Sequence, residues 1–487
     1  MKTMLRDINP RQDWNDRIKT IVSGAKKLKK LRALAAFNVV TDYVAHLDVA
    51  RLSSELAKLP EEKRKKVLEK SHDEARHVEH PADVMAALLH GLRTGKASRV
   101  VASAEALKWL HDVFGEPKEK RIGGQAALMA IQLRELGSKS HLYPAWLSVE
   151  QAQLLPDELI IPVADKKTLK FVKPTRASRP EDPTPISWIF EFKRNDTVTV
   201  EGEILLCPRD NRVIVAYPVS FTPAFKQDFE PALSRLGKEA DVAFLAGFHV
   251  LKSKTYKDVL KTLTRQLLSL KKANKKLRLH YEFVPQEEDE IEKAVLLALG
   301  KCVDSLGLNE VELMDVLEHL GFKKEAKDIE KNESAGTLYQ GARKVLEKLN
   351  VRRVHVHCIG YGLILLQKTE DPEKARDGAL FGSVAASLKS RHGKLDEKVL
   401  KNQVDLAISE AGYNQLGIFE STVWDVFEKR KKRPISALLR KKFMCSGIFE
   451  EKDHFAVIVP APVAQVVKTT VGLGDVVSAC ALAYEVA

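Results

Sequence analysis

The segment FAVIVPAPVAQVVKTTVGLGDVVSACALAY, residues 455–484, joins two apolar runs through a glycine-rich turn. Phe455–Pro460 is typical of a buried strand, and Val476–Tyr484 is typical of a packed helix. The turn between them, VGLGD (471–475), places two glycines and one carboxylate at the mouth of that helix. The free N–H groups and dipole of a helix N-terminus suit an anion. Taken alone, the turn fits an ordinary acidic helix start slightly better.

Strands and helices alternate over most of the chain from residue 240 onward. Asp258–Leu270 has helical spacing, and further strands are expected at VAFLAGF (242–248), LRLHYEF (277–283), VDSLGLN (303–309) and RVHVHCI (353–359). This alternation predicts an α/β fold with a doubly wound, mostly parallel sheet and helices on both faces. Ligands of such sheets bind beyond the carboxyl ends of the strands. Glu282, Asn309 and Asp475 all fall at or just after expected strand ends.

The earlier half of the chain is more mixed. Residues 166–186 are rich in proline and charge and are expected to form an exposed segment. They lead into SWIFEFKRNDTVTVEGEILLC (187–207), which predicts a hairpin around RND. We therefore expect a small sheet that acts as a lid. The predicted domains are discontinuous: residues 1–36, 121–165 and 221–487 form the large α/β domain, and residues 37–120 and 166–220 form the lid.

The overall composition is that of an ordinary globular protein. The chain has 487 residues, of which 44% are hydrophobic and 30% charged, and no apolar run is long enough for a membrane span. The start lacks a signal-peptide core, and five scattered cysteines fit reduced thiols, so we expect a cytoplasmic protein without a membrane partner. The net charge of +13 raises nucleic acid as a partner. The lysine runs lie apart and lack interleaved aromatics, which makes that partner a minor hypothesis.

Several short motifs allow both a functional and a purely structural interpretation. RIGGQ (121–125) allows a sugar hydroxyl to approach the backbone, or it is only a tight turn. FNVVTDYV (37–44) is expected to be one strand with Asn38 and Asp42 at the same parity, and its carboxylate binds a sugar or caps a helix. HYE (280–282) and NEVE (309–312) offer oxygen ligands for Mg²⁺, or ordinary first-turn acids. HDEARHVEH (72–80) is interpreted as a solvated helix face and not as a metal site.

In chain order these pieces resemble the ADP-dependent sugar kinases, the glucokinase and phosphofructokinase family found chiefly in archaea. The resemblance is carried by FNVVTD, GLRTGKA, RIGGQA, FEF, PRDNRVI, AGFHVL, HYEF, DSLGLNEVE, HVHCIGYG and TTVGLGD, which run from residue 37 to 475. NEVE and VGLGD are the most specific of them. The family has a ribokinase-like fold, in which a small sheet closes over the sugar, and its members use ADP as phosphoryl donor together with a divalent cation such as Mg²⁺.

The resemblance implies a role for each matching residue. Asp475 matches the catalytic base, and the N–H groups of Gly472, Leu473 and Gly474 match the anion hole. Residues that match the metal-organising positions are Glu282, Asn309 and Glu312. Residues that match sugar-contacting positions are Asn38, Asp42, Gly123, Gly124 and Gln125. Arg212 matches an arginine that reaches the phosphates, and Thr470 and Val471 are the other expected nucleotide contacts.

Two departures from the family pattern concern the sugar pocket. Val40 replaces a second asparagine, and Ala127 replaces the glycine of GGQAG. Arg99 stands at or near the position where glucokinases carry an acidic lid residue. Together with the basic candidates Lys173, Arg176 and Arg179, it favours fructose 6-phosphate as acceptor; glucokinase activity, alone or as a second activity, is the alternative. A nucleic-acid-binding protein on the same fold is the hypothesis from a different class.

Overall fold

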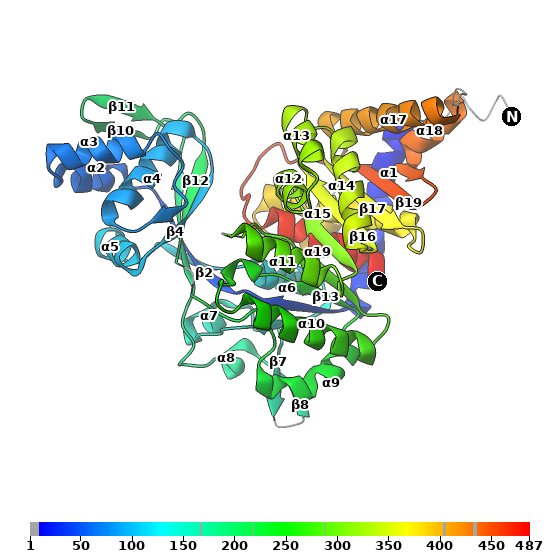
Figure 1. Cartoon of the computed structure of the whole chain (residues 1–487), viewed down its shortest axis with the longest axis horizontal. Helices are drawn as coiled ribbons and strands as arrows, with labels where there is room; N and C mark the ends of the chain where they lie inside the picture. Colours follow the sequence, from blue (N-terminus) through cyan, green and yellow to red (C-terminus); the bar gives the residue numbers. More distant parts are fainter. Residues whose placement is uncertain (1–8, 166–167, 218, 287, 403–405, 432–435) are drawn as a thin grey trace.

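The computed structural model describes residues 9–165, 168–217, 219–286, 288–402, 406–431 and 436–487. The side chains of residues 429–433 are not among those described. This range includes one of the lysine runs of the sequence. Two sheets of different size organise these segments, and each has a separate hydrophobic core. Figure 1 shows them side by side, with the smaller sheet and its helices on the left.

The larger sheet has nine strands in the order β18-β19-β17-β16-β15-β14-β13-β1-β6. From β6 to β16 every neighbouring pair is parallel, whereas β17 and β18 pair antiparallel with their neighbours. Its strands are β1 (Arg32–Phe37), β6 (Lys139–Pro144), β13 (Val242–Leu245), β14 (Arg278–Glu282), β15 (Ser305–Leu308), β16 (Arg353–Cys358), β17 (Tyr361–Gln367), β18 (Ile448–Glu450) and β19 (His454–Pro460). Strands β13 to β15 are buried at every position except Arg278, the first residue of β14, as expected where helices cover both faces.

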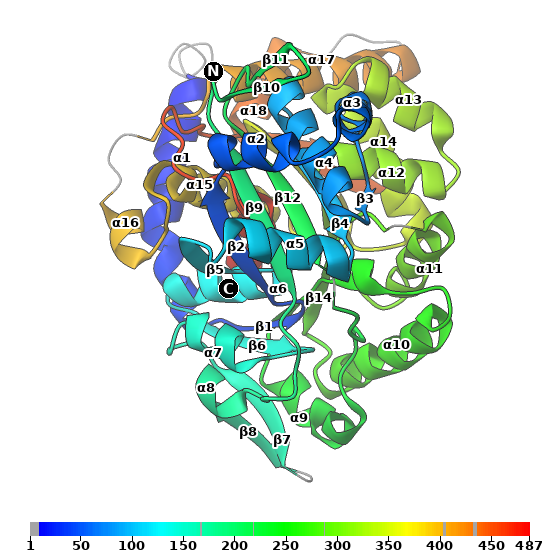
Figure 2. The same ribbon diagram turned by 90° about the vertical axis from the view of Figure 1, so that its left-hand side faces the viewer.

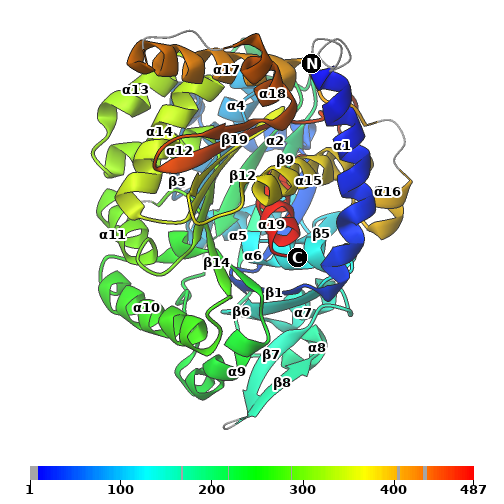
Figure 3. The same cartoon turned by 90° about the vertical axis from the view of Figure 1, so that its right-hand side faces the viewer.

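Helices cover this sheet in two groups (Figure 3). Helices α6, α15 and α19 pack on one side, and α12, α14 and α17 pack on the other. The helices of the large domain are α1 (Pro10–Gly24), α6 (Gln125–Glu135), α7 (Val149–Leu154), α8 (Pro174–Ala177), α9 (Leu233–Lys238), α10 (Tyr256–Ala273), α11 (Asp289–Leu299), α12 (Glu310–His319), α13 (Lys323–Lys331), α14 (Ala335–Leu349), α15 (Pro372–His392), α16 (Glu397–Lys401), α17 (Glu410–Lys431), α18 (Ala437–Ser446) and α19 (Leu473–Val486), with 3₁₀ turns η2 (Ala25–Lys30), η3 (Gln227–Ala232) and η4 (Phe248–Val250).

The smaller sheet has six strands in the order β3-β4-β12-β9-β2-β5. Its strands are β2 (Val40–His46), β3 (His77–Val78), β4 (Ser98–Ala102), β5 (Glu119–Gly123), β9 (Ile186–Phe192) and β12 (Asn211–Tyr217). Trp188, Phe190 and Phe192 of β9 anchor its core. The helices around it are α2 (Val49–Ala57), α3 (Glu61–Lys70), α4 (Pro81–Thr94) and α5 (Ala104–Phe114), as Figure 2 shows. The expected arrangement, a mostly parallel α/β sheet with helices on both faces and a separate small sheet, is confirmed.

Three local predictions are wrong in detail. FNVVTDYV is two strands instead of one, because β1 ends at Phe37 in the large sheet and β2 begins at Val40 in the small one. The hairpin is formed by β10 (Thr197–Val200) and β11 (Glu203–Leu206), because β9 pairs with β2 and β12 instead. Residues 72–80 form a turn and strand β3, which pairs with β4, so they are no helix face.

Two segments lie elsewhere than the predicted domain boundaries would place them. β7 (Ile161–Asp165) and β8 (Thr168–Val172) form a hairpin whose apolar side chains pack on the large core, although residues 166–220 were expected in the lid. Strand β5 pairs with β2 in the lid sheet, although its last three residues fall in the segment 121–165. Chain crossings at residues 38–39 and 123–125 therefore lie at the junction of the two domains. Among the described helices, none has the length and apolar character that a bilayer crossing requires.

Candidate active site

One edge of the large sheet collects the polar residues that follow its parallel strands. Asn38 follows β1, Gly247 follows β13, Glu282 ends β14, Asn309 follows β15 and His357 lies near the end of β16. These five strands are consecutive neighbours in the sheet. The expectation that strand-end residues share one location is met, because parallel neighbours end on the same edge.

The N-terminal turn of α19 faces this edge and requires its glycines. Gly472 is the N-cap, with φ of 65°, and a Cβ there would lie 2.6 Å from Cδ1 of Leu128. A Cβ on Gly474 would lie 2.9 Å from Cε1 of His357. The N–H groups of the first helical turn have no partner within the helix, so they are available to an anion. The predicted glycine turn that opens a helix is present as expected.

Asp475 lies in this first turn and is partly buried. Burial, together with the nearby charge of Glu282, raises the pKa of Asp475 to about 7. Lys389 of α15 and His357 act in the opposite direction. A carboxyl group whose pKa lies near neutrality is suited to accept a proton during a reaction.

Glu282 is held by two histidines. His280 Nε2 lies 2.8 Å from one carboxylate oxygen and His357 Nε2 lies 3.2 Å from the other. Burial alone would raise the pKa of Glu282, but these hydrogen bonds outweigh it and lower the pKa to about 2. The pKa of His357 is raised to about 8, because its bond to Glu282 outweighs burial. Glu282 and His357 therefore form a buried ion pair directly beside the turn of α19.

His357 is the site residue that the sequence analysis missed. It belongs to HVHCIGYG, which was quoted for the family resemblance without a role for any residue in it. The sequence did offer a signal for it. His357 is a polar residue near the end of a strand, β16, whose earlier residues are buried. Its partner Glu282 is 75 residues away in the chain, and only the pairing of β14, β15 and β16 brings the two together.

Asn309 and Glu312 form a reciprocal capping box at the start of α12. Asn309 Oδ1 accepts the N–H of Glu312 at 2.9 Å, and Glu312 Oε2 accepts the N–H of Asn309 at 2.8 Å. Burial, together with the charges of Glu282 and Asp475, raises the pKa of Glu312 to about 8. Both residues therefore cap the start of α12, as the structural interpretation predicts. The cap uses Oε2 of Glu312, so the second carboxylate oxygen remains available to a ligand.

These carboxylates fit a divalent cation that keeps its water shell. The charge of Glu282 raises the pKa of both Glu312 and Asp475, and the charge of Asp475 raises the pKa of Glu312, so these groups repel one another as anions. A bound cation would offset that repulsion. Within the described ranges no group of three His, Cys, Asp or Glu residues converges closely enough to hold a metal ion alone. Water molecules and phosphate oxygens would have to complete the shell, which is how Mg²⁺ commonly binds.

Asp42 and Gly123 face each other across β2 and β5. A Cβ on Gly123 would lie 2.3 Å from Oδ2 of Asp42, so only glycine leaves room for this carboxylate. Asp42 is 8% exposed. Burial raises its pKa to about 7, although the charges of Arg121 and Arg212 oppose the shift. A carboxylate that is buried without a hydrogen-bonded cation is costly to the fold, which is typical of a functional group.

The other predicted sugar contacts are partly occupied by structural bonds. Asn38 Oδ1 accepts the N–H of Ala126 at 3.0 Å, so it caps α6 from the domain junction. Gly124, with φ of 89°, has no room for a Cβ because the Asn38 carbonyl oxygen would lie 2.8 Å away. Gln125 Nε2 donates to the carbonyl of Phe283, and its buried Oε1 has no partner among the described residues. That amide oxygen is available to a ligand hydroxyl.

Arg212 joins the lid to the loop before α19. Its guanidinium donates to the hydroxyl of Thr470, which connects two predicted nucleotide contacts from opposite domains. The N–H of Val471, the third, donates to Thr469 Oγ1 at 3.3 Å within the same loop.

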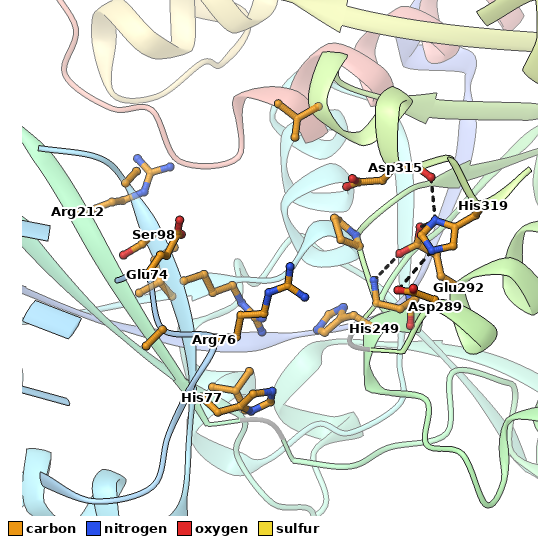
Figure 4. A pocket seen from close by; sticks show the side chains of 18 of the residues that line it. Glu74, Arg76, His77, Ser98, Arg212, His249, Asp289, Glu292, Asp315 and His319 are labelled. Carbon is orange, nitrogen blue, oxygen red and sulfur yellow. Dashed lines mark hydrogen bonds and ion pairs between the residues drawn. The ribbon is translucent and has the colours of Figure 1, made fainter. Parts of the chain in front are cut away.

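A pocket of about 840 Å³ lies between the domains (Figure 4). Arg76, Arg99 and Arg212 line it from the lid, and His249 and Asp315 are among the residues that line it from the large domain. The basic candidates of the segment 166–186 do not line this pocket. Lys173 pairs with Asp157 and Arg179 with Asp182, and Arg176 is exposed on α8.

The chain matches the model of the ADP-specific phosphofructokinase/glucokinase conserved region over residues 32–484. It belongs to this family. An ADP-specific phosphofructokinase of Methanosarcina acetivorans is 30% identical over 424 residues, which are 83% of either chain. An ADP-dependent glucose/glucosamine kinase of Pyrococcus furiosus is 28% identical over 97% of this chain and 98% of its own. A solved ADP-dependent kinase in complex with fructose 6-phosphate and ADPβS is 29% identical, covers 98% of this chain and 97% of its own, and superposes with a TM-score of 0.80.

Proposed function

We propose that the protein is an ADP-dependent phosphofructokinase. It would transfer the β-phosphoryl group of ADP to O1 of fructose 6-phosphate and release fructose 1,6-bisphosphate and AMP. The observation that carries this proposal is the similarity, over 98% of this chain, to a kinase solved with fructose 6-phosphate and an ADP analogue. The basic side chain of Arg99 in the interdomain pocket adds support, because an arginine there favours a phosphorylated sugar.

The residues at the sheet edge divide the work of phosphoryl transfer. Asp475 accepts the proton of the attacking hydroxyl, for which a pKa near neutrality suits it. The N–H groups of Gly472, Leu473 and Gly474 receive the negative charge of the transferring group. The sugar is oriented by residues at the domain junction: Asn38, Asp42, Gly123, Gly124 and the unpartnered Oε1 of Gln125.

The donor nucleotide lies against the loop before α19 in this proposal. Arg212 and Thr470 already contact each other across the domain junction, and Val471 continues the same loop. A guanidinium suits the phosphates of ADP because it offers several donors in one plane. Glu282, Asn309 and Glu312 would hold Mg²⁺ through its waters, and the ion would neutralise phosphate charge when bound.

Glucokinase activity is the second candidate. The relative from Pyrococcus furiosus, which is named for glucose and glucosamine, aligns with nearly the whole chain. Arg99 argues against glucose as the better acceptor, because glucose offers no anion to an arginine.

The test is AMP formation over a matrix of ADP or ATP with fructose 6-phosphate or glucose. We expect the highest kcat/KM for ADP with fructose 6-phosphate. Faster turnover of glucose would replace the proposal by the second candidate, and turnover with ATP alone would contradict the donor. Retention on DNA without ADP consumption would support the nucleic-acid hypothesis instead.

A further inference from the structure

A row of buried polar side chains crosses the middle of the large sheet. In the register of the strands, His280 of β14 lies beside Ser305 of β15, and Ser305 lies beside Arg353 of β16. These three residues on three parallel strands are at most 2% exposed. Apolar residues would fill such a row at lower cost, because buried polar groups need hydrogen-bond partners.

Hydrogen bonds connect this row to Glu282. Arg353 Nη1 donates to Ser305 Oγ at 3.1 Å, and Ser305 Oγ lies 2.9 Å from His280 Nδ1. His280 Nε2 in turn lies 2.8 Å from Glu282 Oε2. Gly307 makes room for this last contact, because a Cβ there would lie against Oε2 of Glu282 and 2.8 Å from Nε2 of His280. The row therefore ends on a carboxylate of the proposed metal site.

The hydrogen-bond donors in the row all run in one direction. An arginine only donates, so Ser305 Oγ is the acceptor in its bond with Arg353. Among the described residues, the acceptor placed for the hydroxyl hydrogen of Ser305 is His280 Nδ1. Nδ1 is then unprotonated, and Nε2 carries the hydrogen that is donated to Glu282. Burial lowers the pKa of His280, which is consistent with a neutral ring.

The last helix holds Arg353 on its other side. Arg353 Nε donates to Glu485 Oε2 at 3.0 Å, and Glu485 lies in the last turn of α19. Burying a guanidinium costs free energy that one ion pair does not always offset, so an apolar side chain would serve the core as well. The presence of an arginine at this position favours a role beyond packing.

We infer that Arg353 is a positioning residue for the proposed phosphoryl transfer and that it fixes the orientation of the Glu282 carboxylate. It acts through Ser305 and His280: the guanidinium polarises the hydroxyl, the hydroxyl fixes the tautomer of the imidazole, and the imidazole holds Oε2 of the carboxylate. Because His357 holds Oε1, both oxygens are oriented before a cation and its waters bind. This inference rests on the proposed function and gives a role to Arg353, which the sequence analysis did not.

Ser305→Ala interrupts the row and leaves Arg353 paired with Glu485. We expect the Mg²⁺ concentration for half-maximal AMP formation to rise about tenfold or more, because loss of a residue that orients a metal ligand commonly weakens metal binding about 10–100-fold. The KM for fructose 6-phosphate should stay near the wild-type value. Ser140→Ala is the matched control, because this serine of β6 is 1% exposed and its hydroxyl has no hydrogen-bond partner among the described residues. It should leave the Mg²⁺ titration unchanged.

A second measurement needs neither metal nor turnover. In protein labelled with ¹⁵N at histidine, wild-type His280 should give the nuclear magnetic resonance signals of a neutral ring with hydrogen on Nε2 and a hydrogen-bonded Nδ1. His280→Gln identifies these signals. Ser305→Ala should move the Nδ1 signal to that of a ring nitrogen without a hydrogen bond, and Ser140→Ala should not. An Nδ1–H tautomer or an imidazolium in the wild type would overturn the inference, because the donors would then run in the other direction.

Arg353 itself is tested with its ion pair removed. Arg353→Met combined with Glu485→Gln should raise the Mg²⁺ requirement as Ser305→Ala does, whereas Glu485→Gln alone keeps an acceptor for the arginine and should not. Adding Ser305→Ala to this double variant should have little further effect, because both changes interrupt the same row.

The outcomes separate the inference from the proposed function. If the wild type is active and Ser305→Ala changes the Mg²⁺ titration no more than Ser140→Ala does, only the inference fails. A wild type that forms no AMP from ADP with either sugar would overturn the proposed function, and with it the role of Arg353.

Discussion

At the residue scale, the proposed role of Asp475 is to accept a proton, while Glu282, Lys389 and His357 act on its charge from three neighbouring elements. We expect Asp475→Asn to lower kcat by about 10²–10⁴, because asparagine keeps the size of the side chain but cannot take a proton. The measurement is AMP release at saturating ADP and fructose 6-phosphate. Thermal shifts with each ligand should stay near those of the wild type. A variant with full turnover would reduce Asp475 to an acid that merely begins a helix.

Asp42 offers a test through stability, because its pKa is about 7 in the folded chain against an ordinary value of 3.8. As pH rises, the carboxyl group of Asp42 ionises in the unfolded chain before it does so in the folded chain. The free energy of unfolding therefore decreases between about pH 4 and about pH 7 and stays reduced by the same amount at higher pH. Asp42→Asn removes the cost. We expect its advantage in unfolding free energy over the wild type to grow by about 2 kcal/mol between pH 5 and pH 8.

The measurement for Asp42→Asn is urea unfolding at both pH values, with Asp73→Asn as an exposed control on the same domain. The same substitution should raise the KM for the sugar, so stability and function should change in opposite directions. An advantage that does not depend on pH would show that Asp42 is not held protonated by the fold.

Individual site residues could be predicted from the sequence only where the neighbouring residues in the chain determine their positions. Asn309 and Glu312 lie three residues apart, and Asp475 lies in one short turn, so their arrangement is written in the chain itself. The pairing of His357 with Glu282 depends on the register of three strands and could not be read locally. The positions of Lys173, Arg176 and Arg179 depend on where α8 packs, which charge alone does not determine.

At the element scale, the start of α12 combines a helix cap with a proposed metal site. Glu312→Gln should keep the capping box, because glutamine also accepts the N–H of Asn309, and the melting temperature should change little. The Mg²⁺ concentration for half-maximal rate should rise severalfold, because a carboxylate is lost. Asn309→Ala loses the cap and should cost about 1 kcal/mol of stability in addition. An unchanged Mg²⁺ titration in both variants would leave only the structural role.

The packing of α15 on α19 positions the glycine turn that we propose to be catalytic. A Cβ on Gly382 would lie 2.5 Å from the carbonyl oxygen of Val477, and one on Gly378 would lie 2.5 Å from that of Ala481. Gly382→Ala should therefore push α19 away and cost about 1–3 kcal/mol. Because α19 carries Asp475, we also expect kcat to fall about tenfold or more.

Gly417→Ala is the control for this packing, because a Cβ there meets nothing within 4 Å in α17. It should stabilise the chain by up to about 1 kcal/mol without affecting kcat, as alanine favours helix. If Gly382→Ala behaves like Gly417→Ala, the two helices adjust freely and their contact does not fix the site.

Secondary-structure elements were predicted well where the hydrophobic pattern was strong. They were predicted poorly where pairing with a distant strand determines the structure. The apolar runs that became β13, β14, β15 and β19 could be recognised because both faces of these strands are buried. β3 is only His77–Val78 and exists because β4 offers an edge to pair with, so the polar string 72–80 gave no sign of it. The split of residues 37–44 between two sheets follows from the domain junction, which no local pattern marks.

At the scale of the whole molecule, two sheets with separate cores face one pocket, and the chain crosses between them several times. This arrangement is typical of enzymes in which a lid closes over the substrates and excludes water. The presence of a lid was predictable from the extra strands in the sequence. Its orientation was not, because that depends on contacts such as Arg212 with Thr470, which are 258 residues apart.

That contact leads to a prediction about closure. In X-ray scattering, the wild type should become more compact when ADP and fructose 6-phosphate are both present. Arg212→Ala should reduce this compaction and raise the KM for ADP about tenfold or more, because one guanidinium would serve both the phosphates and the loop before α19. Thr470→Val removes the same hydrogen bond from the other domain, so the two substitutions should not be additive in kcat/KM. Arg194→Ala, an exposed arginine of the lid, should change neither quantity. Additive effects of Arg212→Ala and Thr470→Val, with normal compaction in both, would mean that the lid closes without this contact.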